Sequence, residues 1–338
     1  MKTKKMILSF ILGAVILPAS VYCLAIRIAS VARTGSPWHL ALEELGREWE
    51  QVSRGEVKIR VDPDQLMGSE YDMIQGMRSG ELEGAAFFNR GLPRLCPGAY
   101  IFTVPLVIHS EEEYHYVFKQ MKPGFEKRIE AGGFKVIAWS LSGWLKLFSK
   151  DPVFYPADLK KHKLSLTTWN QEIETVWRDN GFHVVPTDFK DLQMALQRGM
   201  VDAFFLSPLE AKDGEYFTLA PNMCTQTSGP EYWCIVLTVE TWAKIPDQYK
   251  EQMEEAAEKL SKKIYKKILE LEKKAVEEME EQDLIVNKLP ADALEEWQAK
   301  IRSGLDKLLK KDALLKEAFA GMMQYLKEYR EKHPPPAR

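Results

Sequence analysis

Aromatic side chains gather where five predicted strands end, with serine or asparagine residues beside several of them. In open α/β sheets, ligands bind in crevices beyond the carboxyl ends of strands, where rings form apolar walls and a few polar groups orient the ligand. Core packing explains any one segment, but five together predict a lined cleft. The predicted lining residues of this kind are Trp38, Phe88, Asn89, Trp139, Ser140, Trp144, Trp169, Asn170, Phe204, Phe205, Ser207 and Trp233.

Known catalytic and cofactor motifs are absent from the sequence. It contains no phosphate-binding G-x-x-x-x-G-K-[ST], no G-x-G-x-x-G, no H-E-x-x-H, no C-x-x-C and no G-x-S-x-G. The segment from His109 to His115 has metal-ligating residue types, but a helix start with an acidic first turn explains it better. We therefore predict no catalytic residue, no bound metal and no cofactor.

The first 23 residues differ from the rest of the chain. Lys2, Lys4 and Lys5 precede an apolar run that ends in small residues, a pattern typical of a secretory signal peptide. A membrane anchor or a buried strand is the alternative. Lipidation at Cys23 is less favoured because Tyr22 before it is large. We expect a periplasmic protein whose net charge, −3 in the full chain, becomes −6 after the three lysines are removed.

Composition restricts the partners and the covalent links. The near balance of 46 basic and 49 acidic residues gives no broad footprint for nucleic acid. Disulfides are permitted in an exported protein, and Cys224 and Cys234 flank a turn-rich stretch that can close a short loop. A disulfide between them, and two small buried thiols, are equally compatible with this pattern.

The first elements of the mature region read strand, helix, strand. An alternating segment at 24–31 is followed by Ser36 and Pro37, which suit the start of a helix that ends before Gly55. A second strand follows at 57–61. This order predicts a mixed α/β domain with parallel strand pairing.

A helix–glycine–strand unit occurs twice, at residues 69–87 and 188–205. Ser69 and Asp188 suit N-caps, and eleven residues after each cap a glycine suits a left-handed helix end. The repeat predicts two similarly built lobes, whereas two unrelated helix–strand units are the alternative.

The last third is dense in Glu and Lys. From 247 to 283 it lacks Gly and Pro, and its apolar residues are spaced by threes and fours, which predicts one long amphipathic helix. Such a helix braces two lobes, projects outward or pairs with a partner. Two more helices are predicted at 291–303 and 304–331, with a disordered tail at 333–338.

Several segments together resemble the solute-binding subunits of TRAP transporters. They are Val61–Ser69, the helix and glycine after it, Ile101–Leu106, Pro156–Lys163, and Asp191–Asp202. The resemblance implies a periplasmic-binding-protein-like α/β fold with mixed sheets, in which two lobes enclose a cleft. It also implies a small-molecule ligand, TRAP membrane subunits as partners and, in some members, a tetratricopeptide-repeat (TPR) protein. The expected division is lobe I at 24–147 with crossing segments from about 235–260, lobe II at 148–234, the helix at 247–283, and C-terminal helices at 284–332.

Two positions depart from this family's pattern. Where the family places carboxylate-binding arginines, this chain has Ser165 and Leu145, which we add to the predicted site. Neither can replace a planar guanidinium, so the departure predicts an apolar or amphipathic ligand rather than a typical carboxylate. Lys146 or Lys163 acting as the acid-binding cation is the rival interpretation. An exported enzyme acting on a hydrophobic substrate and a scaffold that uses the long helix are the alternative functions.

Overall fold

The computed structural model describes residues 23–166 and 171–334. Residues 1–22 of the predicted signal peptide, Trp169, Asn170 and the last four residues lie outside these ranges. Within the described ranges, no helix combines the length and the hydropathy needed to cross a bilayer.

The N-terminal part folds as the sequence predicts. β1 (Leu24–Ser30) pairs in parallel with β2 (Val57–Asp62) and with β3 (Gly84–Phe87). α1 (Pro37–Val52) begins at the predicted cap, since the Ser36 hydroxyl accepts the backbone N–H of His39. These elements, with α2 (Glu70–Ser79), form what we call lobe I.

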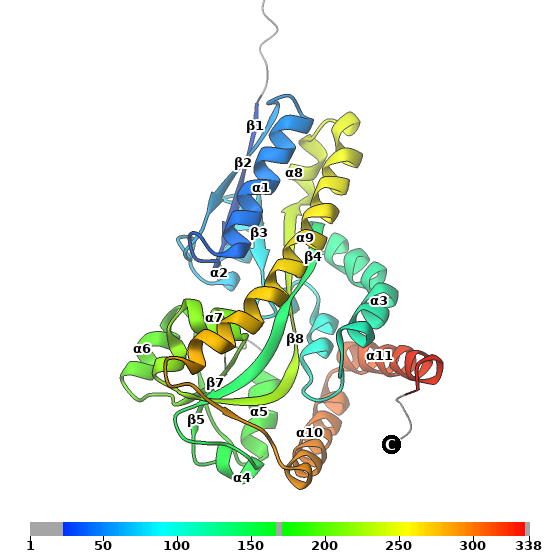
Figure 1. Cartoon of the computed structure of the whole chain (residues 1–338). Coiled ribbons are helices and arrows are strands. Elements are labelled where there is room, and N and C mark those ends of the chain that lie inside the picture. Colours follow the sequence, from blue (N-terminus) through cyan, green and yellow to red (C-terminus); the bar gives the residue numbers. More distant parts are fainter. Residues whose placement is uncertain (1–22, 167–170, 335–338) are drawn as a thin grey trace, which may run out of the picture.

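Two long antiparallel strands connect lobe I to the second lobe. They are β4 (Phe134–Ser149) and β8 (Asn222–Thr238), which lie side by side in the middle of a single sheet of order β2-β1-β3-β8-β4-β7-β5-β6. The strands β5 (Lys163–Leu166), β6 (His183–Pro186) and β7 (Ala203–Leu206) form the part of this sheet that lies in lobe II. The short β9 (Ile285–Asn287) pairs with β8. The lobes therefore share the two continuous strands β4 and β8 (Figure 1).

The repeated unit is present in both lobes. α2 has a capping box between Ser69 and Asp72 and ends at Gly80, whose φ is +79°. In lobe II, Asp188 caps a 3-10 turn, η3 (Phe189–Asp191), before α6 (Leu192–Gln197), and Gly199 has a φ of +63°. Each unit continues into the strand nearest the crossing strands, β3 or β7, so the sequence repeat corresponds to a structural one.

The long helix α9 (Asp247–Glu280) extends along both lobes. It packs against α1 in lobe I, against β4, and against α7 (Pro208–Asp213) in lobe II. Figure 1 shows it running diagonally over the crossing strands. The long helix was expected to brace two lobes, to project outward or to pair with a partner. In the structure it packs on both lobes and so braces them.

The second of the two C-terminal helices begins at residue 313, nine residues later than the predicted start at 304. α10 (Ala291–Lys311) and α11 (Ala313–Lys332) meet at Asp312, whose side chain accepts the N–H of Leu315 and caps α11. Gly304 lies inside α10, where a Cβ would lie 2.9 Å from the Val176 side chain of lobe II. This glycine therefore permits a close helix contact and does not mark a helix end.

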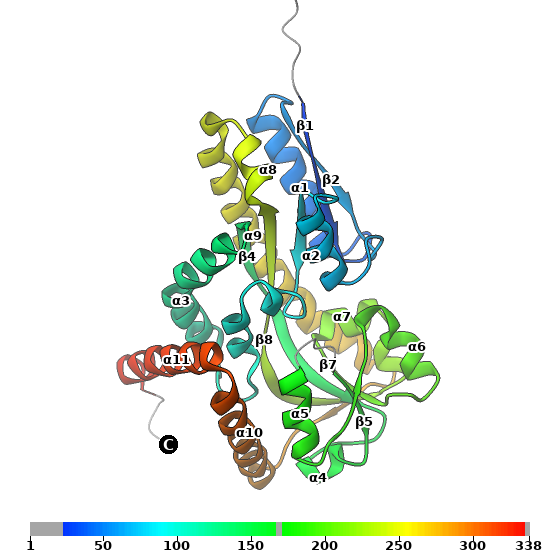
Figure 2. The same ribbon diagram turned by 180° about the vertical axis from the view of Figure 1, so that it is seen from behind.

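α10 and α11 connect the lobes on the side opposite α9. α10 packs on α4 (Pro156–Leu159) and α5 (Gln171–Asp179), whereas α11 packs on α3 (Glu111–Ala131) and the 3-10 helix η2 (Pro97–Thr103). Figure 2 shows this side. The start of α3, capped by Ser110 and followed by three glutamates, accounts for the segment between His109 and His115. The remaining short helices are η1 (Leu92–Arg94), η4 (Tyr216–Thr218) and α8 (Val239–Lys244).

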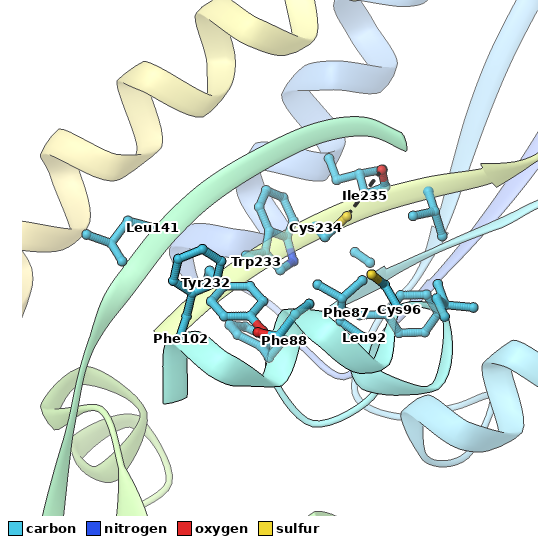
Figure 3. Close-up of a cluster of buried hydrophobic side chains, with 14 of the residues drawn as sticks. Phe87, Phe88, Leu92, Cys96, Phe102, Leu141, Tyr232, Trp233, Cys234 and Ile235 are labelled. Atoms are coloured by element: carbon cyan, nitrogen blue, oxygen red, sulfur yellow. Dashed lines mark hydrogen bonds between the residues drawn. The ribbon is translucent and has the colours of Figure 1, made fainter. Parts of the chain in front are cut away.

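The disulfide considered between Cys224 and Cys234 does not form. The stretch between them is not a loop but part of the extended strand β8, and both thiols are free and buried. Ten residues of strand rise about 33 Å, whereas bridged Cα atoms lie within about 7 Å. Cys234 instead belongs to the lobe I core with Phe87, Tyr232 and Trp233 (Figure 3).

Candidate functional site

A cavity of about 170 Å³ lies between the two lobes and is lined from four directions. Lobe I contributes the end of β3 and the chain around η2, through Asn89, Arg90, Tyr100, Thr103, Val104 and Pro105. The crossing strands contribute Leu145, Ser228 and Glu231. A site built from both lobes changes shape whenever the lobes move relative to each other.

The remaining walls come from lobe II and from the C-terminal helix. Lobe II supplies mainly large apolar side chains, Leu166, Ile173, Val176, Trp177, Phe182 and Phe205. α10 supplies Trp297, Lys300, Ile301, Gly304, Leu305 and Leu308. The cavity is therefore mostly apolar, with a small number of charged groups at its boundary.

Arg90 is the cation at the lobe I wall, and it forms an ion pair with lobe II. Its Nη2 atom lies 2.9 Å from Oε1 of Glu210 on α7, and its Nη1 atom lies 3.3 Å from Oε1 of Glu231 on β8. The guanidinium carbon also lies 4.2 Å from the ring centroid of Phe189 in lobe II. Because the three charged side chains are at most 10% exposed, this cluster is a buried contact between the lobes.

Burial controls the ionisation of the carboxyl groups around Arg90. It raises the pKa of Glu231 well above its ordinary value, although Arg90 opposes the shift. It raises the pKa of Glu70 to about 7. The Glu70 Oε1 atom accepts the N–H of Phe88 at 2.9 Å and so fixes the end of β3. Among the described residues, Arg90 Nε and Glu231 Oε2 are buried atoms without a hydrogen-bond partner.

Of the predicted site residues that the structure describes, three line the cavity: Asn89, Leu145 and Phe205. The Asn89 amide donates to the carbonyl of Pro230 at 2.9 Å and accepts the N–H of Tyr232 at 2.8 Å. Its side chain thereby ties the end of β3 to β8, which places Arg90 beside Glu231. Asn89 therefore acts as a positioning residue for the charged cluster.

Several predicted residues form the immediate support of the lobe I wall. Phe88 packs edge-on against Trp38, with ring centroids 5.3 Å apart, and the Trp38 indole donates to Ser142 on β4. Trp233 is buried in the same core. The Trp139 indole donates to Glu126 of α3, and the Ser140 hydroxyl to the carbonyl of Ser261 in α9.

The predicted residues of lobe II have similar supporting places. Phe204 stacks on Phe148 inside the lobe, and Ser207 caps α7, the helix that carries Glu210. Ser165 is buried beside the lining residue Leu166, and its hydroxyl has no partner within the described ranges. Trp169 and Asn170 lie outside those ranges.

The two lysines considered as acid-binding cations do not line the cavity. Lys146 Nζ donates to the carbonyl of Thr225 at 2.7 Å, and Lys163 Nζ donates to that of Gly199 at 2.8 Å. Lys146 lies between Leu145 and Leu147 in β4, both of which face cavities. Lys146 instead interacts electrostatically with Glu272 of α9.

Glu272 of α9 contacts β4 where this strand crosses between the lobes. Its Oε1 atom accepts the N–H of Trp144 at 3.3 Å, next to an irregularity in the pairing of β4 with β8. Burial raises the pKa of Glu272 to about 8, partly opposed by that N–H and by Lys146. The long helix therefore contacts the crossing strand through a carboxyl group that is protonated at neutral pH.

This protonation makes stability depend on pH. Because the folded-state pKa of Glu272 is raised, its stabilising contribution is complete below about pH 4.5 and is lost as pH rises toward about 8. We expect Glu272→Gln to flatten the fall in unfolding free energy between pH 5.5 and 7.5 by about 2 kcal/mol, measured by urea denaturation. Glu278→Gln on the same helix is the control, since the pKa of Glu278 is lowered. An unchanged pH slope in the Glu272 variant would contradict the assignment.

Comparisons with known proteins identify relatives of this chain. A solute-binding protein of Roseobacter denitrificans is 26% identical over 230 residues, which cover 66% of this chain and 69% of the relative. Alignments with further curated relatives span about half of each relative's length.

Solved structures share the fold. A TRAP periplasmic solute-binding protein of Roseobacter denitrificans with bound β-D-glucuronate has a TM-score of 0.81 at 19% identity, covering 88% of this chain and 98% of that one. The corresponding protein of Desulfovibrio salexigens with bound orotic acid has a TM-score of 0.78 at 20% identity, covering 91% and 98%. The family model for bacterial extracellular solute-binding proteins, family 7, matches residues 28–312. This chain therefore belongs to the family 7 bacterial extracellular solute-binding proteins.

Proposed function

We propose that the protein is the extracytoplasmic solute-binding subunit of a TRAP-type transporter. It captures a small organic acid in the cavity between its lobes and presents it to membrane subunits. The observation that carries this proposal is the cavity itself, which takes walls from both lobes and from α10. A protein acting only as a scaffold has no use for such a space. Export through the N-terminal segment and association with a TPR protein stay predictions from the sequence.

The related structures do not support the prediction of an apolar or amphipathic ligand. Their bound molecules are acids: glucuronate, galacturonate, gulonate and orotic acid. Ser165 and Leu145 exclude an acid-binding arginine at only two positions of the chain. Arg90 lines the cavity from a third position, at the end of β3.

Ligand capture follows from population shift. A ligand that contacts both lobes stabilises the arrangement in which those contacts exist. Arg90 and Glu210 already join the lobes across one edge of the cavity, and the Arg33 guanidinium of lobe I donates to the carbonyl of Asp213 in lobe II at 3.1 Å. A bound acid adds contacts to this set and so favours the closed form that a membrane partner can recognise.

Binding of acids to the purified mature protein tests the proposal. Isothermal titration calorimetry with D-glucuronate, D-galacturonate, L-gulonate and orotate is expected to give saturable binding of at least one of them. Neutral sugars of the same size, such as D-glucose, are the matched control and are expected not to bind. Binding of the neutral sugar with equal affinity, or of none of the acids, would refute the proposal.

A further inference from the structure

Lys300 is the cation on the cavity wall that lacks an acidic partner. Among the described residues, the side chains of Asp, Glu, Lys, Arg or His type that line the cavity are those of Arg90, Glu231 and Lys300. The Arg90 guanidinium lies 2.9 Å from Glu210 and 3.3 Å from Glu231, so it is already paired with carboxyl groups. Within the described ranges no carboxyl group forms an ion pair with Lys300, which leaves its ammonium group open to a ligand.

Lys300 differs from the other cations considered for the site. It lies on α10, half-buried, with Trp297 one helical turn before it and Gly304 one turn after it on the same wall. Within the described ranges it forms no hydrogen bond and no ion pair, in contrast to Lys146, Lys163 and Arg90. A lysine with its stem along apolar surface and an unpaired ammonium is suited to meet an anion.

We propose that Lys300 binds the ligand's carboxylate and restricts the site to acids that carry one negative charge. This inference rests on the proposed function and adds a residue and a charge class to it. One carboxylate is balanced by Lys300. A second would be buried without a partner cation, since Arg90 is engaged by Glu210, and a buried unpaired charge is strongly unfavourable.

The surrounding wall accommodates the rest of such an acid. Trp177, Phe205 and Trp297 come from α5, β7 and α10, and their rings give the cavity its apolar surface. A pyranose or pyrimidine ring can lie against these faces while its carboxylate points to Lys300. The charged group and the rings that hold the ligand body thus come from different elements, which makes the site dependent on the packing of α10 against α5.

Calorimetry on four forms of the mature protein tests the role of Lys300. Wild type, Lys300→Gln, Lys300→Arg and Lys307→Gln are titrated with the acids named above, and Lys307 is the control because it is exposed on the same helix and does not line the cavity. For an acid that wild type binds, Lys300→Gln is expected to weaken affinity about 10- to 100-fold. Lys300→Arg is expected to retain most of the affinity, and Lys307→Gln all of it.

The charge class is tested by pairing D-glucuronate with D-glucarate, which has a second carboxylate on the same carbon skeleton. Weaker binding of D-glucarate supports the inference, and tighter binding overturns it. Wild-type affinity in Lys300→Gln also overturns it but leaves the proposed function standing, whereas failure of every acid to bind wild type refutes that function. Equal melting temperatures of the two glutamine variants without ligand are expected, because Lys300 makes no polar contact within the described ranges.

Discussion

Replacing Arg90 by methionine is expected to lower the free energy of unfolding by about 3–5 kcal/mol at pH 7.5. The substitution removes the cation that pairs with Glu210 and Glu231, both less than 10% exposed, and leaves the Glu210 carboxylate buried without a partner. Methionine keeps most of the side-chain volume, so the loss reports the charge and not a cavity. Urea denaturation followed by far-ultraviolet circular dichroism measures it.

A control and a rescue make the expectation specific to the buried cluster. Arg128→Met breaks the pair with Glu317, whose two side chains are 39% and 69% exposed, and is expected to cost at most about 1 kcal/mol. Adding Glu210→Gln to the Arg90 variant removes the unpaired charge and is expected to restore part of the stability. If Arg90→Met costs no more than Arg128→Met, the cluster does not hold the lobes together.

Local sequence signals predicted the elements that position the site. The Ser36 and Ser69 caps fixed the starts of α1 and α2, and the spacing of apolar residues fixed α9 to within three residues of its end. These features depend on hydrogen bonds and side-chain contacts within one or two helical turns, which neighbouring residues determine. The repeated unit with Gly80 and Gly199 correctly indicated two lobes of similar construction.

The charged part of the site depends on contacts distant in the chain. Arg90 pairs with Glu210 and Glu231, which lie 120 and 141 residues away. Arg90 directly follows Phe88 and Asn89, which were predicted as lining residues because they lie at a strand end. Arg90 itself was not predicted. The wall from α10 had no such signal, because the predicted break at Gly304 divided the helix that carries Lys300. Cys224 and Cys234 likewise looked like the ends of a loop because strand β8 contains Gly229 and Pro230.

The crossing strand β4 gives the second large expectation. Gly143 has a φ of +124°, and a Cβ placed on it would lie 2.6 Å from Cδ of Glu272 and closer still to Oε1. Gly143→Ala therefore combines backbone strain of about 1–3 kcal/mol with displacement of the Glu272 carboxyl group from the Trp144 N–H. Loss of a buried hydrogen-bond partner costs about 1–3 kcal/mol more. We expect a total loss of about 2–6 kcal/mol in the free energy of unfolding, measured by urea denaturation.

The two causes can be separated. In a Glu272→Ala background the alanine at position 143 no longer meets the carboxyl group, but the backbone strain remains, so the further loss should be smaller than in wild type. Gly124→Ala is the matched control, since Gly124 lies in α3 and a Cβ added there would meet nothing within 4 Å, and it is expected to gain about 0.5–1 kcal/mol. Equal losses from Gly143→Ala in both backgrounds would exclude the steric contact with α9. A smaller loss in the Glu272→Ala background means that the Glu272 side chain of α9 occupies the space beside position 143 of β4, which a Cβ at that position would take.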